Sequence, residues 1–295
     1  MKLKKLIAVA LTAVMTMSLT ACGGGNTTGT TSGGAVDDGK TYNIGICQLV
    51  QHEALDAATK GFKDALTKKL GDKVKFDEQN AQGDSPTCAT IVNSFVSENV
   101  DLILANATAP LQAAATGTTD IPILGTSVTD YGTALNIKDW KGTTGVNVSG
   151  TSDLAPLDQQ AAMIKELFPD KKKVGLLYCS AEANSLYQVE TIKGYLEKDG
   201  YTCTNYSFVD SNDIASVVSN AAKNSDVIYV PTDNTAASNT EVIRNTCVPA
   251  KVPVVAGEQG ICNGCGVATL SISYYDLGYT TGEMAYDVLV NGKDV

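Results

Sequence analysis

Short apolar runs alternate with segments of helical periodicity through the first half of the chain. Strands are predicted where the apolar runs have strand length, at residues 42–50, 74–81, 100–107 and 121–127. Helices are predicted where apolar residues recur three and four positions apart, at residues 54–70, 86–98 and, more briefly, 110–115. This alternation predicts a parallel sheet whose crossover connections are right-handed.

The same order of elements occurs again in the second half. Strands are predicted at residues 173–179, 201–209, 225–231 and 252–258, and helices at residues 184–198, 213–222 and 236–247. The run that starts at Asp101 has its counterpart at Asp226, 125 positions later (226 − 101), and the run at Ile121 has its counterpart at Val252, 131 positions later (252 − 121). A repeated order at a nearly constant offset predicts two similar lobes.

Two connecting segments relate these lobes. Residues 144–153 carry the chain out of the first lobe, and residues 266–278 lead it back, so that the last helix packs on the first lobe. The predicted fold is therefore α/β, with two doubly wound Rossmann-like lobes joined by hinge crossover strands: residues 41–150 plus 275–295 form lobe 1, and residues 151–274 form lobe 2. Because the chain stops directly after a helix, we expect a final strand or third crossing to be missing, which leaves a sheet edge unpaired.

Residues 1–21 have the pattern of an export signal. Three lysines among the first five residues precede an apolar run at residues 6–19, which is too short for a spanning helix. Small residues then lead to Cys22 in "LTAC", which resembles the lipobox of bacterial lipoproteins, where this cysteine carries the lipid. An ordinary signal peptide with an incidental cysteine is the alternative. Residues 22–40 lack apolar periodicity and are predicted to be a flexible tether, so the folded part is expected to be extracytoplasmic and lipid-anchored to the cell membrane.

The net charge and the cysteines limit the possible functions. The charge is −10, and removal of the three signal-peptide lysines brings it to −13 (−10 − 3), which argues against nucleic-acid binding and against adhesion to anionic lipid. Seven cysteines remain besides Cys22, an odd number. Cys262 and Cys265 form a CxxC pair that could be a disulfide, a redox pair or half of a metal site. With one histidine and no second CxxC pair, no zinc site is expected; we expect reduced thiols or one local disulfide, without a catalytic role.

Motifs of common enzymes are missing from the sequence. It has no GxGxxG after the first strand, no GxxxxGK[ST], no HExxH and no GxSxG, and one histidine excludes most histidine-based catalytic groups. Asp210, Asn212 and Asp213 are too few for a calcium loop. We therefore predict no enzyme activity, no cofactor and no metal, although a catalytic carboxylate pair such as Asp233 with Glu258 stays open as an alternative.

Polar residues follow the predicted strands of both lobes. At residues 231–234, for example, an apolar strand ends directly before Thr, Asp and Asn. Such residues commonly cap helix N-termini, but the carboxyl ends of strands in open α/β sheets also form ligand sites. Because polar residues gather at strand ends in both lobes, we predict a small-molecule site between the lobes.

Eight stretches resemble one protein family and span nearly everything from Asn43 to Ala285. They read "IGICQLVQHEALDAATKGF", "NAQGD", "DLILANAT", "IPILGTSVTD", "NVSGTSD", "SAEANS", "VIYVPTDNTAAS" and "SYYDLGYTTGEMA". They are similar to signature stretches of the tryptophan/aromatic amino-acid subfamily of substrate-binding lipoproteins of bacterial ABC importers, which have the type I periplasmic-binding-protein fold. The resemblance implies a monomeric receptor that captures an aromatic amino acid (tryptophan, phenylalanine or tyrosine) between its lobes and delivers it to an ABC permease. A receptor for another small solute, or a ligand sensor acting in trans on a membrane signalling partner, is the alternative.

A zwitterionic amino acid needs an anion site, a cation site and space for its side chain. Asn184 and Ser185 open a helix and are the candidates for binding the carboxylate. Asp233 is the first choice for binding the ammonium group, with Asn234 orienting it and Glu258 as the rival anion. Each of these residues could instead be a helix cap or a turn residue.

Further ligand-binding candidates lie in lobe 1 and on the crossing segment. Those at strand ends of lobe 1 are Gln48, Thr108 and Thr126. Those on the crossing segment are Thr151 and Ser152. The tyrosines that could form an aromatic wall, or belong to the core or rim, are Tyr131, Tyr178 and Tyr274. His52, directly after the first strand, is interpreted as a helix-start or cleft-wall residue.

Overall fold

Two parallel β-sheets form the frame of residues 39–295, the part of the chain that the computed structural model describes. The first sheet has the strand order β2-β1-β3-β4-β5, and the second has the order β10-β9-β8-β6-β7. The strands of the first sheet are β1 (Tyr42–Gln48), β2 (Val74–Asn80), β3 (Leu102–Asn106), β4 (Ile123–Val128) and β5 (Val148–Ser152). Those of the second are β6 (Lys173–Cys179), β7 (Thr202–Phe208), β8 (Val227–Val230), β9 (Val254–Ala256) and β10 (Ala268–Thr269). All strand pairs of the two sheets run parallel, which confirms the predicted α/β fold class.

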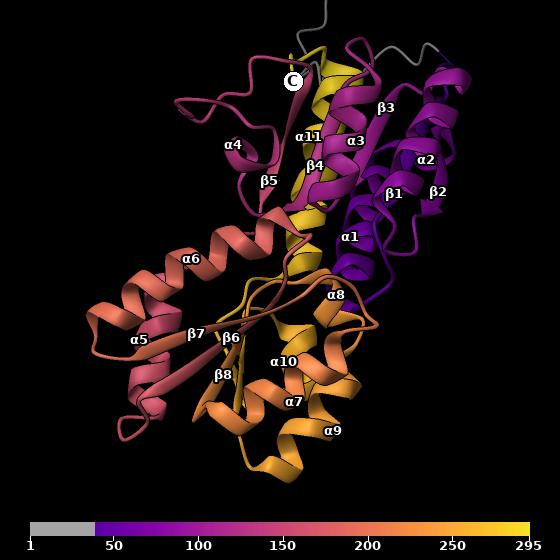
Figure 1. The fold of residues 1–295 in the computed structure, drawn as a ribbon. Coiled ribbons are helices and arrows are strands. Elements are labelled where there is room, and N and C mark those ends of the chain that lie inside the picture. The colour runs from indigo at the N-terminus through magenta and orange to yellow at the C-terminus, as the bar shows by residue number, and fades with distance from the viewer. Residues whose placement is uncertain (1–38) are drawn as a thin grey trace, which may run out of the picture. The chain divides into compact units, whose positions relative to one another are not determined.

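Helices cover both faces of the first sheet (Figure 1). The helices of this lobe are α1 (Glu53–Leu70), α2 (Ser85–Glu98), α3 (Thr108–Gly117), α11 (Tyr274–Asn291), the short α4 (Tyr131–Ala134) and the 3-10 turn η1 (Gly71–Lys73). On one face, Phe62 of α1 and Ala285 of α11 belong to the same apolar cluster as Ile44 of β1. On the other face, Phe95 of α2 packs with Cys47 of β1. Side chains of one strand thus enter two cores, as expected for a strand whose side chains alternate.

The second sheet is covered in the same way. The helices of this lobe are α5 (Leu157–Leu167), α6 (Ala183–Lys198), α7 (Ile214–Asn224), α8 (Asn234–Ala237), α9 (Thr240–Ala250) and α10 (Gln259–Cys265). Ile164 of α5 and Ile192 of α6 share one apolar cluster, whereas Val218 of α7, Ile243 of α9 and Ile261 of α10 share another. Two layers of helix around each sheet leave the strand ends as the place where polar groups can gather.

Helix α11 returns the chain to the first lobe, where it lies alongside α1 (Figure 1). The two helices approach closely because glycines stand at their contact. A Cβ atom on Gly61 would lie 2.1 Å from the carbonyl oxygen of Tyr275, and one on Gly278 would lie 1.9 Å from that of Ala58. The first part of α11 is thereby held at the junction of the two lobes, which places Tyr274 beside the strand ends.

One predicted helix is wrong in its extent. Residues 236–247 were expected to form a single helix, but α8 and α9 are separated at Ser238 and Asn239. The hydroxyl of Ser238 donates to the carbonyl of Asn234 at 2.7 Å, and the amide of Asn239 donates to that of Thr235 at 2.8 Å. Side-chain donors that occupy these carbonyls compete with a continuous helical hydrogen-bond ladder.

The first crossing segment, residues 144–153, contains a strand, as predicted. Its residues pair with β4 as β5, so the first sheet extends to Ser152, two residues beyond the boundary predicted at residue 150. The predicted signal peptide, Cys22 and nearly all of the tether lie outside the described residues. Within residues 39–295, no helix is both long and apolar enough to cross a membrane. The seven cysteines there carry free thiols, and Cys262 and Cys265 lie in α10.

Candidate ligand-binding site

A cavity of about 360 Å³ lies between residues of both lobes, at the carboxyl ends of their strands. We call it the interlobe cavity. Leu49, Val50 and Thr108 line it from lobe 1, and Asn184 and Asn234 line it from lobe 2. It therefore combines apolar side chains with the first residues of helices, where free backbone N–H groups favour an anion.

A smaller pocket of about 10 Å³ adjoins the interlobe cavity, and Asn184 and Asn234 line both. Asp153, Asp233 and Glu258 line this pocket, so we call it the acidic pocket. All three side chains are buried, with at most 4% of their surface exposed. None of the described residues that line the acidic pocket is a lysine or an arginine.

Asp233 is both a helix cap and a wall of the acidic pocket. Its carboxylate accepts hydrogen bonds from the backbone N–H of Ala236 at 2.7 Å, in the first turn of α8, and from that of Cys179 at 2.6 Å. Burial raises the pKa of Asp233 to about 8, with the charge of Glu182 adding to the increase and the backbone donors opposing it. Asp233 therefore caps α8 and also lines the acidic pocket, and its role in ligand binding stays a prediction.

Glu258 is likewise both a helix cap and a lining residue of the acidic pocket. Its carboxylate caps α10 by accepting from the backbone N–H of Gly260 and Ile261, both at 2.5 Å. Burial raises the pKa of Glu258 to about 7, although the two backbone donors lower it. The charges of Glu53 and Asp153 add to the increase. At neutral pH this carboxyl group is thus poised between its two protonation states.

Asp153 completes the acidic pocket, and the sequence did not single it out. Its carboxylate accepts from the hydroxyl of Thr129 at 3.0 Å and from that of Tyr274 at 2.8 Å. Burial raises its pKa, and the two hydroxyl donors oppose the increase. The only sequence signal was its position as the last residue of the crossing segment, where the predicted crossover strand would place it at a strand end.

Glu182 is a second acidic residue that sequence reasoning missed. Its carboxylate accepts from the backbone and side-chain donors of Asn234 and Thr235 at 2.7–3.0 Å, and from the amide of Asn184 at 3.1 Å. Asn184 and Asn234, which were predicted to meet the ligand, are therefore held by a carboxylate of the protein at the edge of the interlobe cavity. A ligand at this place would find both amides already oriented.

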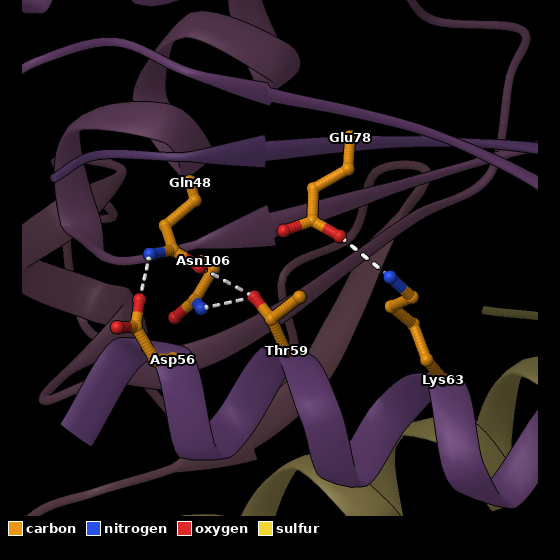
Figure 2. A network of polar contacts seen from close by, with 6 residues as sticks. All are labelled: Gln48, Asp56, Thr59, Lys63, Glu78 and Asn106. Carbon is orange, nitrogen blue, oxygen red and sulfur yellow. Dashed lines mark hydrogen bonds and ion pairs between the residues drawn. The ribbon is translucent and has the colours of Figure 1, made fainter. Parts of the chain in front are cut away.

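Gln48 does not line either cavity but joins an internal network of lobe 1 (Figure 2). Its amide donates to Asp56 at 2.7 Å, and its carbonyl oxygen accepts from the hydroxyl of Thr59 at 2.6 Å. Asn106 donates to the same hydroxyl at 2.9 Å. Gln48 thus connects the end of β1 to α1, and it also donates to the carbonyl of Val50, which lines the interlobe cavity.

Of the threonines and serines predicted to bind the ligand, one lines a cavity and the others do not. Thr108 reaches the interlobe cavity, whereas Thr126 and Thr151 lie within hydrogen-bond distance of each other at 3.4 Å, and Thr151 also contacts Thr281 of α11 at 2.8 Å. Ser152 is exposed and donates to the carbonyl of Thr129. Ser185 is fully buried, and its side chain opposes the increase in the pKa of Asp233. None of these supporting groups lines the two cavities.

The predicted aromatic wall is reduced to one member. Tyr131 donates to the carbonyls of Gly125 and Thr151, both at 3.0 Å, and belongs to the core of lobe 1. Tyr178 belongs to the core of lobe 2. Tyr274 alone of the three lines the acidic pocket, through the geometry of α11.

Side chains of the two lobes also contact each other across the site. The ring nitrogen Nε2 of His52 lies 3.2 Å from Oδ1 of Asn234. Gln188 of α6 donates to the hydroxyl of Thr129 at 3.1 Å. Both residues of the first contact line the acidic pocket, whereas Gln188 and Thr129 line neither cavity and join the two lobes beside them.

Two parallel α/β lobes with a solute-sized cavity between their strand ends define a two-lobed solute-binding protein. The chain belongs to the ABC transporter substrate binding protein family, whose sequence profile matches residues 43–295. Among its relatives, the tyrosine-binding protein of Clostridioides difficile is 39% identical over 301 residues, which cover 100% of this chain and 86% of that protein. The family predicted from the signature stretches is thus confirmed.

Two solved structures of proteins similar in sequence differ in how closely their folds superpose on this chain. The Streptococcus pneumoniae ABC domain in complex with L-Trp has a TM-score of 0.83 at 36% identity, and 86% of each chain is covered. The ligand-free, open structure of a substrate-binding protein with adhesive properties from Clostridium difficile has a TM-score of 0.63 at 39% identity, covering 86% of this chain and 87% of that chain. The open structure is the poorer match despite its higher identity. This agrees with a closed arrangement of the lobes in this protein, in which side chains of the two lobes hydrogen-bond to each other.

Proposed function

We propose that this protein captures an aromatic amino acid between its lobes and delivers it to the permease of an ABC importer. The similarity to the tyrosine-binding protein and to the tryptophan complex supports this ligand class. Membership of a substrate-binding family supports a receptor rather than an enzyme. The ligand would contact both lobes and stabilise their closed arrangement by its higher affinity for that state, which the permease then recognises.

The acidic pocket is the observation that carries the proposal. Three buried carboxyl groups without a neighbouring lysine or arginine are costly in a folded protein, because each loses the hydration of its charged form. An ammonium group brought by the ligand would compensate this cost. The adjoining interlobe cavity has space for an aromatic side chain against Leu49 and Val50, and helix starts for the ligand carboxylate.

The N-terminal pattern supports a place of action at the cell membrane. We propose that Cys22 carries a lipid and that the tether keeps the folded part close to the outer face of the cell membrane as a monomer. Replacement of this residue in Cys22→Ala should release the protein from the membrane fraction into the soluble fraction. An unchanged membrane association of the variant would contradict the anchor.

Calorimetric titration tests the ligand class. The protein is unfolded and refolded to remove any co-purifying ligand, and tryptophan, tyrosine, phenylalanine and the aliphatic control leucine are then titrated. We expect saturable one-to-one binding of at least one aromatic amino acid, without turnover, and none of leucine. Absence of binding by the well-folded protein would refute the aromatic ligand.

Asp233→Asn separates the two roles of Asp233. Asparagine is as good an N-cap as aspartate, so the start of α8 should be kept while the charge is lost. Loss of a buried charge partner of an ammonium should weaken binding by about 2 kcal/mol or more, roughly thirtyfold in Kd. An unchanged Kd, with an unchanged thermal midpoint, would show that Asp233 acts as a cap alone.

A further inference from the structure

Four buried side-chain atoms within residues 39–295 have no hydrogen-bond partner: His52 Nδ1, Asn106 Oδ1, Ser127 Oγ and Thr269 Oγ1. Buried polar atoms are nearly always paired in folded proteins, so each exception calls for an explanation. Two of the four, in His52 and Ser127, belong to residues that line the acidic pocket. Ser127 was not among the predicted site residues, and His52 was interpreted only as a helix-start or cleft-wall residue. They come from different parts of lobe 1, since Ser127 lies in β4 and His52 directly precedes α1.

Ser127, which lines the acidic pocket, has an uncommon backbone conformation. Its φ is +56°, in the left-handed region that residues other than glycine rarely adopt. The register between β4 and β5 shifts at this place, between Gly125 and Val128. Only 7% of Ser127 is exposed, so its hydroxyl is shielded from solvent. Backbone strain of this kind persists where the surrounding structure enforces it, and it concentrates at ligand sites.

The hydrogen bond of His52 to the other lobe determines which of its ring nitrogens is an acceptor. Nε2 lies 3.2 Å from Oδ1 of Asn234, whose amide nitrogen donates to Glu182. Since Oδ1 can only accept, Nε2 carries the proton and donates. Burial lowers the pKa of His52 and favours the neutral ring, which leaves Nδ1 with a free lone pair.

Size and charge select the group that these acceptors would bind. A volume of about 10 Å³ is about that of one water-sized group, which matches an ammonium group and is too small for a carboxylate or a ring. The carboxyl groups of Asp153, Asp233 and Glu258 repel an anion in their ionised form, and a bound cation favours that form. An ammonium group has three N–H donors, and the residues that line the pocket include Ser127 and His52, whose Oγ and Nδ1 have no hydrogen-bond partner.

We infer that Ser127 Oγ and His52 Nδ1 accept hydrogen bonds from the ammonium group of the bound amino acid, in the pocket that Asp153, Asp233 and Glu258 also line. The inference rests on the proposed function and adds the residues that distinguish an amino acid from the same molecule without its amino group. The rest of the ligand then extends past Asn184 and Asn234 into the interlobe cavity, because these two residues line both spaces.

The test compares matched ligands on matched variants of the full chain. The ligands are L-tyrosine with 3-(4-hydroxyphenyl)propionate, and L-tryptophan with 3-(indol-3-yl)propionate, each pair differing only in the amino group. Ser127→Ala removes one acceptor. His52→Gln removes Nδ1 but retains an amide donor for Asn234. Thr269→Val is the control, because it removes an equally buried and unpartnered hydroxyl that does not line the acidic pocket.

Hydrogen bonds to a charged group are stronger than those between neutral groups, so we expect Ser127→Ala and His52→Gln each to weaken amino-acid binding by about tenfold or more. The propionates, which bind more weakly to the wild type, should change by less than about twofold, and Thr269→Val should change neither. Equal losses for both members of a pair, or no loss for the amino acid, would overturn the inference and leave the proposed function standing. Failure of the wild type to bind any aromatic amino acid would overturn both.

Discussion

The carboxyl group of Glu258 should make the stability of the ligand-free protein decrease as the pH rises. Burial raises its pKa from an ordinary 4.5 to about 7, against the two backbone donors that cap α10. Between these two values the folded state binds more protons than the unfolded state. The stability that protonated Glu258 provides is therefore complete below pH 4.5 and is lost as the pH rises through 7.

The size of the effect follows from the difference between the two pKa values. They differ by about 2.5, and each pKa unit corresponds to about 1.4 kcal/mol, so the loss is about 3 kcal/mol in total. Burial also raises the pKa of Asp153 and of Asp233, which adds to the loss in the same direction. The contribution of Glu258 must therefore be measured as a difference between two proteins.

Urea unfolding of wild type and Glu258→Gln at several pH values between 5 and 8 measures that difference. Glutamine has the size of the protonated acid and retains an oxygen for the α10 cap. We expect the free energy of unfolding of the wild type to fall with pH by about 2–3 kcal/mol more than that of the variant. Parallel curves, or a wild type that becomes more stable toward pH 8, would refute the assignment of a buried, proton-binding carboxyl group.

Three further outcomes are expected. Gly278→Ala, whose Cβ would lie 1.9 Å from the carbonyl oxygen of Ala58, should lower the free energy of unfolding by about 1–3 kcal/mol, whereas Gly194→Ala, with open space around it, should raise it by about 0.5–1 kcal/mol in the same denaturation assay. Tyr274→Phe removes the hydroxyl that donates to buried Asp153 and should cost about 1–3 kcal/mol of stability; an unchanged urea midpoint would contradict a buried bond. Binding of an ammonium ligand should lower the raised pKa values of the acidic pocket and release protons, so Kd should fall as the pH rises from 6 to 8; equal heats of binding at pH 7 in buffers of different ionisation enthalpy would contradict this.

The elements of the fold could be predicted from local pattern. The helix expected at 54–70 is α1 at Glu53–Leu70, and that expected at 86–98 is α2 at Ser85–Glu98, because their apolar spacing is set within each segment. The break between α8 and α9 was missed because two side chains there bond to backbone carbonyls instead of pointing to solvent. Repetition of the element order predicted two lobes without reference to any contact between them.

The site could be predicted only as a region. Five of the residues selected by strand-end position line the two cavities, and their binding of a ligand stays a prediction: Asp233, Glu258, Asn184, Asn234 and Thr108. The same reasoning also selected residues that lie behind the wall, because a strand-end side chain can point to either face of the sheet. The sequence does not show which face a helix will cover, so the two kinds of residue could not be separated.

The sequence by itself determined the α/β class, the two similar lobes, the family and the acidic character of the chain, since these depend on periodicity, composition and local motifs. The tertiary structure alone decided which polar groups form the acidic pocket. Asp153 meets Tyr274 across 121 positions of sequence, and His52 meets Asn234 across 182. Burial and the proximity of other charges determine the protonation of such groups, and both arise only when distant segments pack together.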